Sequence, residues 1–212
     1  MDPADARNPY SALLSRIGHR RRPVTNGVVF TVTAAVGIAQ LVHPRLLGLG
    51  RRDAAAIDRG EWWRLLTGMF LQDGRLPGLL VNLVALALVG TAAERVFGWW
   101  KWLLLYFGCG LFGQAMSYLW LHPDGAGNSM CVTGLIGALA TVVLLAARRF
   151  GTPVARQPWL TALAVPVLAV ADTAVHDNHG LPALLGTALG ALLLPAPAAP
   201  PETPVRQSVA RD

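Results

Sequence analysis

The chain has 212 residues, of which 53% are hydrophobic and only 14% are charged. Soluble domains carry about 25% charged residues, so this composition argues against a soluble globular protein. The charges gather in short segments, and the apolar stretches between them are about as long as a bilayer is thick. The formal net charge of +6 then reflects orientation in a membrane rather than binding to nucleic acid. We therefore expect an all-α, polytopic membrane protein.

Six apolar stretches are candidates for membrane-spanning helices. They cover about 27–42, 76–96, 99–120, 129–147, 158–175 and 180–194. The chain thus divides into a cytoplasmic arm at 1–22, a six-span membrane domain at 23–196 and a cytoplasmic tail at 197–212. The tail is rich in proline and alanine, and we expect it to be disordered. Both cysteines, Cys109 and Cys131, fall in apolar stretches, so no disulfide framework is predicted.

Arginine and lysine positions predict the orientation, because cytoplasmic segments of membrane proteins carry an excess of both. With the N-terminus inside, twelve of the 18 positive residues lie in cytoplasmic segments and six lie in the first outer loop. The other two outer loops have none. The sequence therefore predicts an N-in, C-in topology with six spans.

The first outer loop, about 44–75, contains Glu61-Trp62-Trp63-Arg64-Leu65-Leu66. Two tryptophans beside an arginine suit a segment that lies in the headgroup region of a membrane. A loop surrounded by water would instead expose the apolar run from Trp62 to Leu71. We therefore expect this loop to lie at the outer membrane surface.

Three polar residues lie on the outer side of spans that run from outside to inside. Asn82 is about two turns into the second span, Ser129 begins the fourth, and His179 begins the sixth. A serine and a histidine brought together can form a nucleophile and base pair. Polar or ionisable residues at such positions are candidates for function.

Each of these residues also has a structural explanation. A serine before an apolar helix is commonly an N-cap, a histidine there can be interfacial, and an asparagine can join two helices. Glycine spacing favours the functional reading. Small residues on the fourth and sixth spans let two helices approach closely, as a hydrogen bond between Ser129 and His179 requires. These are Gly134, Gly137, Gly186 and Gly190.

Four motifs in this order resemble the rhomboid intramembrane serine proteases, over roughly Gly60 to Leu194. Gly60–Thr67 is similar to the tryptophan–arginine loop, and Asn82 with Glu94–Gly98 resembles the second span and its turn. Gly127-Asn128-Ser129 followed by Gly134-Leu135-Ile136-Gly137 matches the Gly-x-Ser segment. His179 with Gly186 matches the last span.

The resemblance implies a six-helix rhomboid bundle in which Ser129 is the nucleophile and His179 its base. The Ser129 backbone N–H and the Asn82 side chain would stabilise the oxyanion. Sliding the register would make Thr133 the nucleophile, about 6 Å deeper along the helix, but the glycine match would be lost. We expect no acid to complete a triad: Asp177 is expected to face the membrane interface, and neither it nor Asp172 is expected to have a catalytic role.

Three residues depart from the family pattern. Gly78 stands where the family usually has a histidine that donates to the oxyanion. Met130 replaces a glycine after the serine, and Thr133 stands where an aromatic ring often packs on the histidine. Loss of one oxyanion donor costs about 10²–10³ in rate in other enzymes.

The predicted function is intramembrane serine endopeptidase cleavage of transmembrane proteins near the outer face by a Ser-His dyad. The alternative is an inactive rhomboid-like protein that binds transmembrane clients, which Gly78, Met130 and Thr133 favour. A metal-dependent protease using His176 and His179 and a small transporter fit the sequence less well. We expect no metal and no cofactor, the lipid bilayer and transmembrane substrates as partners, no nucleic acid, and a bacterial plasma membrane. Substrate-binding residues and oligomeric state stay open.

Overall fold

The computed structural model of the protein describes residues 22–151 and 153–194. Residues 1–21 of the predicted arm and the whole predicted tail lie outside the described residues. Within the described part, every regular element is a helix, and the only β-type pairing is a single bridge between Arg52 and Gly125. The expected all-α fold class is confirmed.

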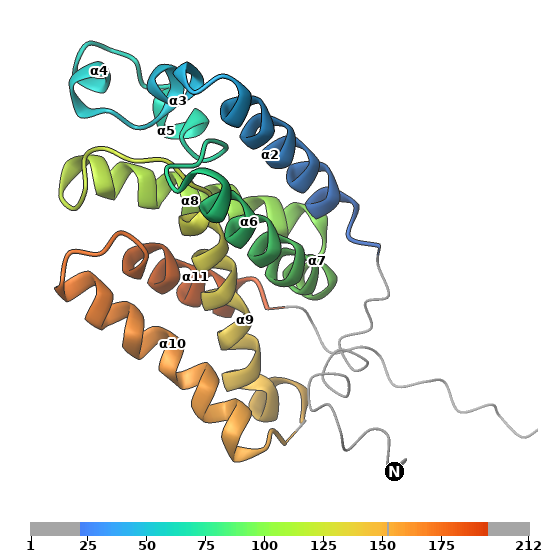
Figure 1. The fold of residues 1–212 in the computed structure, drawn as a ribbon. Coiled ribbons are helices and arrows are strands. Elements are labelled where there is room, and N and C mark those ends of the chain that lie inside the picture. The colour runs from blue at the N-terminus through green and yellow to red at the C-terminus, as the bar shows by residue number, and fades with distance from the viewer. Residues whose placement is uncertain (1–21, 152, 195–212) are drawn as a thin grey trace, which may run out of the picture.

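The helices follow one another in the order shown in Figure 1, and their bounds are as follows. They are α2 Val24–Val42, α3 Arg45–Gly50, α4 Ala54–Asp58, α5 Arg64–Thr67, α6 Arg75–Ala85, η2 Leu86–Gly90, α7 Thr91–Phe97, α8 Trp99–Leu119, α9 Ser129–Phe150, α10 Arg156–Ala174 and α11 Gly180–Leu192. The π-helical turn η2 joins α6 and α7 into one continuous helix.

Each of the six predicted apolar stretches forms a helix that begins and ends within three residues of the predicted limits. Four of them are long and apolar enough to cross a membrane, namely Val24–Val42, Arg75–Phe97, Trp99–Leu119 and Ser129–Phe150. The helices α10 and α11 are not among these four, and α11 has only 13 residues. The protein is therefore a helical, multi-pass membrane protein.

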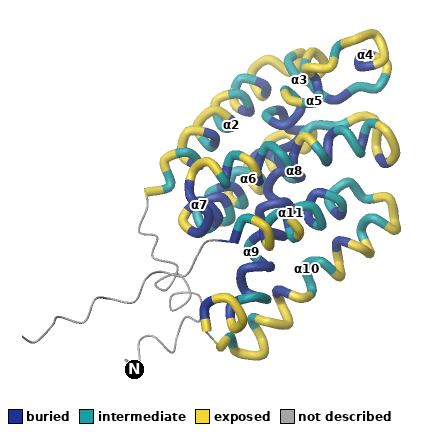
Figure 2. The backbone as a smooth tube through the Cα atoms, turned by 180° about the vertical axis from the view of Figure 1, so that it is seen from behind, coloured by how far each residue is buried: buried dark blue, intermediate teal, exposed yellow. Residues whose placement is uncertain are grey.

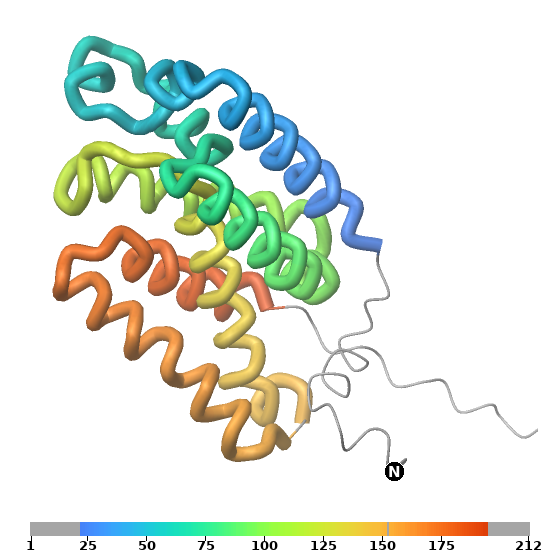
Figure 3. The backbone as a smooth tube through the Cα atoms, in the orientation of Figure 1, coloured from blue at the N-terminus to red at the C-terminus, as the bar shows by residue number. Residues whose placement is uncertain are grey.

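The helix α9 lies in the middle of the bundle (Figure 3). It packs against α8, α10, α11, α7 and η2. Seen from behind, α9 is mostly buried, whereas α10 and the outer side of α2 are largely exposed (Figure 2). Exposed apolar side chains on peripheral helices are expected where lipid rather than water is the solvent.

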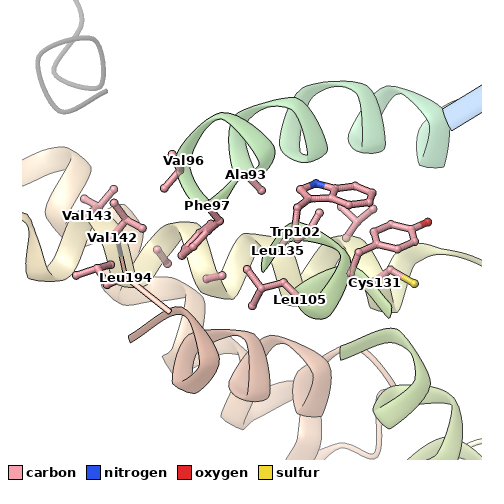
Figure 4. Close-up of a cluster of buried hydrophobic side chains, with 14 of the residues drawn as sticks. Ala93, Val96, Phe97, Trp102, Leu105, Cys131, Leu135, Val142, Val143 and Leu194 are labelled. Atoms are coloured by element: carbon pink, nitrogen blue, oxygen red, sulfur yellow. The ribbon is translucent and has the colours of Figure 1, made fainter. Parts of the chain in front are cut away.

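The core surrounds α9 along most of its length and is formed by apolar side chains from several helices (Figure 4). Trp102 is fully buried, stacks on Tyr106 with ring centroids 4.8 Å apart, and donates to the Gly90 carbonyl at 2.9 Å. Buried Glu94 joins α7 to the start of α2, because its carboxylate accepts from the backbone N–H groups of Thr25 and Asn26 at 3.0 and 2.6 Å. This contact satisfies N–H groups that have no partner within α2.

The first outer loop folds into the short helices α3, α4 and α5 at one end of the bundle (Figure 1). Arg64 is buried and bonds Glu61 at 2.7 Å and the carbonyls of Gly48 and Arg51. Trp62 and Trp63 point outward, with 57% and 55% of their surface exposed. This arrangement agrees with a loop that presents its aromatic side to the membrane surface.

Candidate active site

Ser129 and His179, which lie 50 residues apart in the chain, meet at one end of the bundle. Ser129 is the first residue of α9, and His179 immediately precedes α11. The Oγ atom of Ser129 lies 2.8 Å from Nε2 of His179. A serine hydroxyl at this distance from an imidazole nitrogen can transfer its proton to it.

Glycines on the facing sides of α9 and α11 permit this meeting. A Cβ added to Gly186 would overlap the carbonyl oxygen of Gly134, and one added to Gly137 would overlap that of Ala183. One turn further along, a Cβ on Gly190 would lie 2.6 Å from the Cα of Ala138. The predicted close approach of the two helices is confirmed, since their backbones touch where any larger residue would separate them.

Asp177 is the third residue of this group, and our expectation that no acid stands beside the serine–histidine pair is wrong. Its Oδ1 atom lies 2.7 Å from Nδ1 of His179 and accepts the His179 backbone N–H at 2.8 Å. Aspartate commonly accepts from the N–H two residues later, because the short side chain reaches back over the turn. That local turn was the signal in the sequence, in the spacing of Asp177 and His179.

Partial burial raises the pKa of Asp177, but the hydrogen bonds from the backbone and ring of His179 lower it more, and the net shift is downward. The side chains of Asp177 and His179 are 43% and 36% exposed. Asp177 is therefore a carboxylate at neutral pH, in contact with the ring nitrogen that faces away from Ser129.

Asn82 lies near Ser129, and it contacts Gln72, a residue that the sequence analysis did not identify. The Asn82 amide donates to Oε1 of Gln72 at 2.5 Å. A Cβ added to Gly127 would lie 3.6 Å from Ser129 Oγ, 3.7 Å from Asn82 Nδ2 and 3.9 Å from Gln72 Oε1. Gly127 has a φ of +152°, and its missing side chain leaves a small space bordered by all three polar atoms.

Gln72 is held by two further amides. Its backbone N–H and carbonyl pair with the side chain of Gln40 on α2 at 2.8 and 2.6 Å, and its Nε2 donates to Oδ1 of buried Asn128 at 3.3 Å. The loop before α6 is thus fixed both to α2 and to the residue that precedes Ser129. A single uncharged glutamine beside Asp73 offered little sign of this in the sequence.

Arg52 fixes the loop before Ser129 to the first outer loop. Its backbone pairs with Gly125 in both directions, at 2.9 and 3.0 Å, and its guanidinium donates to the carbonyls of His122 and Asp124. Burial lowers the pKa of Arg52 to about 10, although the Asp73 and Asp124 carboxylates act in the opposite direction. Arg52 therefore stays charged at neutral pH and was counted from sequence only as one of the outer charges.

Ser129 and His179 open into a polar cavity of about 230 Å³. Its lining also includes Arg52, Asp73, His122, Asp124, Gly125, Ala126, Gly127, Met130 and Asn178. The cavity has the polarity and the convergent groups expected at a reaction site.

The structure also shows the surroundings of Thr133, Met130 and Gly78, the three positions that depart from the family pattern. Thr133 Oγ1 donates to the Met130 carbonyl at 3.1 Å within α9, whereas Ser129 is the residue that contacts the histidine. Buried Met130 receives the Ser117 hydroxyl on its sulfur. A Cβ on Gly78 would meet no atom of the described residues within 4 Å, so this position leaves room for the first atom of a side chain.

His176 packs against an aromatic ring. Its ring lies 5.4 Å from that of Trp120, edge to face. Among residues 22–151 and 153–194, no three His, Cys, Asp or Glu side chains form a group that could hold a metal ion. The metal alternative therefore has no ligand set in the described part of the chain.

These features define a class: a multi-pass helical membrane protein with a serine–histidine pair where its central helix begins. The Rhomboid domain family matches residues 59–196. The chain is 39% identical to "Rhomboid protease GluP" of Bacillus subtilis over 99 residues, which are 47% of this chain but 19% of that protein. It is 31% identical to "Putative rhomboid protease YdcA" of the same organism over 140 residues, covering 65% of this chain and 68% of that protein. The chain belongs to the rhomboid family.

A fungal rhomboid protein is also similar to this chain, at lower identity. "Rhomboid-type serine protease 2" of Emericella nidulans is 28% identical over 145 residues, which are 65% of this chain and 28% of that protein. The matched part thus spans only a fifth to a third of two of these three relatives. The chain is thus a member of a family of serine intramembrane proteases.

Proposed function

We propose that this protein is an intramembrane serine endopeptidase that cleaves transmembrane substrate proteins near the outer face of the membrane. The observation that carries the proposal is the 2.8 Å contact between Ser129 Oγ and His179 Nε2 at the start of α9. An α9 of 22 residues is about 33 Å long, close to the thickness of a bilayer core. Its first residue therefore lies near one membrane surface.

In the proposed reaction, Ser129 Oγ attacks the carbonyl carbon of a substrate peptide bond while His179 Nε2 takes the hydroxyl proton. The resulting oxyanion accepts from the Ser129 backbone N–H and from Asn82 Nδ2. His179 then gives the proton to the leaving amine, and an acyl-enzyme forms. A water that is deprotonated by His179 releases the acid and regenerates Ser129.

The helix N-terminus supports this assignment of the oxyanion donors. Ser129 is the first residue of α9, where backbone N–H groups have no partner within the helix and carry a partial positive charge. The space beside Gly127 lies within 4 Å of both Ser129 Oγ and Asn82 Nδ2. We place the oxyanion in this space.

The same proposal includes six spans with both termini in the cytoplasm of a bacterial cell. The arginines of the two ends and of the loops at 95–101 and 148–156 then lie inside. In this topology α11 begins below the outer surface of the membrane, and His179, just before it, lines the polar cavity. Substrates and bilayer lipids would be the partners.

A second candidate function is a catalytically inactive rhomboid-like protein that binds transmembrane clients. Gly78 favours it, because the family's histidine donor to the oxyanion is missing there. The contacts of His179 with Ser129 and Asp177 favour the protease.

Labelling with a fluorophosphonate probe distinguishes the two functions. Purified wild-type protein in detergent is expected to form a phosphonyl adduct, and mass spectrometry should locate it on Ser129. Ser129→Ala should abolish labelling and Thr133→Ala should retain it. A folded wild type that takes up no label would contradict the protease proposal, and an adduct on Thr133 would overturn the register.

A further inference from the structure

We propose that Asp177 is a positioning residue that orients His179 and stabilises its protonated form, so that the site works as a Ser129–His179–Asp177 triad. This inference rests on the proposed function. It starts from the ring of His179, whose two nitrogens have different partners. Nε2 lies 2.8 Å from Ser129 Oγ, and Nδ1 lies 2.7 Å from Asp177 Oδ1. A carboxylate only accepts hydrogen bonds, so it holds the proton on Nδ1 and leaves Nε2 free to accept from serine.

The backbone around Asp177 is built to hold it in this place. The helix α10 ends in a Schellman motif: His176 N–H bonds the Thr173 carbonyl at 3.1 Å, and Asp177 N–H bonds the Asp172 carbonyl at 2.8 Å. His176 occupies the left-handed position with φ +61°, where glycine is usual. Its ring packs on Trp120, which offsets the cost of that conformation.

The Asp177 side chain then closes the next turn. Oδ1 accepts both the backbone N–H of His179 and its ring Nδ1, at 2.8 and 2.7 Å. One oxygen therefore ties the backbone and the side chain of the histidine together. This limits the rotation of the imidazole and keeps Nε2 directed at the serine.

During acylation the imidazole would gain the serine proton on Nε2 and keep its own proton on Nδ1. The resulting positive charge is then adjacent to the Asp177 carboxylate, and hydrogen bonds between charged groups are stronger than those between neutral ones. Asp177 takes up no proton in this scheme. Its role is to favour the charged ring that forms only as the reaction proceeds.

Other titratable and charged residues near Asp177 and His179 also affect the electrostatics of the site. His122 acts on Asp177 across the cavity, and it lowers the pKa of the carboxyl less than His179 does. The remaining charged residues that line the cavity are Arg52, Asp73 and Asp124. Arg52 is engaged with backbone carbonyls, and none of these residues makes the contact with Nδ1 of His179 that Asp177 makes.

The test compares Asp177→Asn and Asp177→Ala with the matched control Asp172→Asn. Asp172 is a nearby acid that contributes its backbone carbonyl, and not its side chain, to the hydrogen bonds that end α10. Cleavage of a single-span substrate is measured in proteoliposomes across the pH range, with thermal unfolding as a check of folding. Asp177→Asn retains an oxygen that can accept the His179 N–H, so a role limited to the turn leaves activity near wild type. We expect instead a fall in kcat of about tenfold or more at unchanged KM, because the charge is lost.

The pH profile provides a readout that a structural role would not move. Without the carboxylate, the protonated ring loses its partner, so the acidic limb of the kcat/KM profile should shift to lower pH in both Asp177 variants. The control Asp172→Asn should retain the wild-type limb. Asp177→Asn with activity within twofold of wild type and an unchanged limb would overturn the inference.

A second measurement keeps this inference separate from the proposed function. If wild type cleaves nothing, the proposed function fails, and NMR of nitrogen-labelled protein still reports on His179. We expect a strongly downfield Nδ1 proton in wild type and in Ser129→Ala that is lost in Asp177→Asn. Its absence from folded wild type would overturn the role of Asp177 by itself.

Discussion

At the scale of single residues, the site combines the predicted pair Ser129 and His179 with two residues that were not predicted to belong to it, Gln72 and Asp177. Ser129 and His179 could be identified from the sequence, because both lie on the same side of predicted spans and both fit family motifs. Gln72 could not, and Asp177 left only its two-residue spacing from His179 as a signal. Gln72 lies in the loop before α6 and contacts Asn82 through its side chain. Asp177 contacts His179 after α10 ends in a left-handed residue.

Gly78 offers a prediction about the oxyanion. The space beside it is open among the described residues, and one oxyanion donor is worth about 10²–10³ in rate in other enzymes. We expect Gly78→His to raise kcat for substrate cleavage by about tenfold or more. Gly78→Ala is the matched control: it has no donor and should leave kcat near wild type. Equal rates for the two variants would show that the open space is not the site of a donor.

At the scale of elements, the contact between α9 and α11 determines whether the site exists. Both polar residues sit at the ends of these helices, so any change in helix separation moves Ser129 relative to His179. Gly186 touches the Gly134 backbone, and Gly190 touches Ala138. The motif spacing predicted this contact because glycines repeat along one face of each helix.

A single methyl group at this contact is therefore expected to destabilise the protein and to disturb the contact of Ser129 with His179. Gly186→Ala should destabilise the protein by about 1–3 kcal/mol, as overpacking does, and lower the rate of probe labelling at Ser129 by at least about tenfold. Gly27→Ala is the control, since a Cβ on Gly27 in α2 meets no described atom within 4 Å. Thermal unfolding and labelling rates measure both effects. A Gly186→Ala protein that matches the control in both would contradict the proposed role of the helix contact.

Helix positions were predicted more accurately than the loops between them. Apolar runs bounded by charges place each helix within three residues, because burial in lipid requires continuous apolar sequence with its backbone hydrogen bonds made internally. The π-turn η2 within the second predicted span was not foreseen. It lies where Gly90 packs against the Asn26 side chain and accepts from Trp102, and these tertiary contacts leave no periodic pattern in the sequence.

At the scale of the whole molecule, orientation links the site to its substrates. The proposed N-in, C-in topology places Ser129, His179 and the first outer loop on the outer side. Both native cysteines are fully buried, so a cysteine introduced on the surface can be labelled with little background.

Labelling by a membrane-impermeant maleimide tests this orientation in intact cells. Arg59→Cys in the first outer loop, whose side chain is 66% exposed in wild type, should react in intact cells. Arg149→Cys, at the exposed end of α9, should react only after permeabilisation. The reverse pattern would invert the topology and place the serine on the cytoplasmic side.

Cleavage of a single-span substrate in proteoliposomes tests the central claim most directly. Wild-type protein should cut the substrate within or near its membrane segment on the side that carries Ser129. Ser129→Ala and His179→Ala should each leave it intact while remaining folded by thermal unfolding. Cleavage that persists at the wild-type rate in Ser129→Ala would contradict the assignment of Ser129 as the nucleophile.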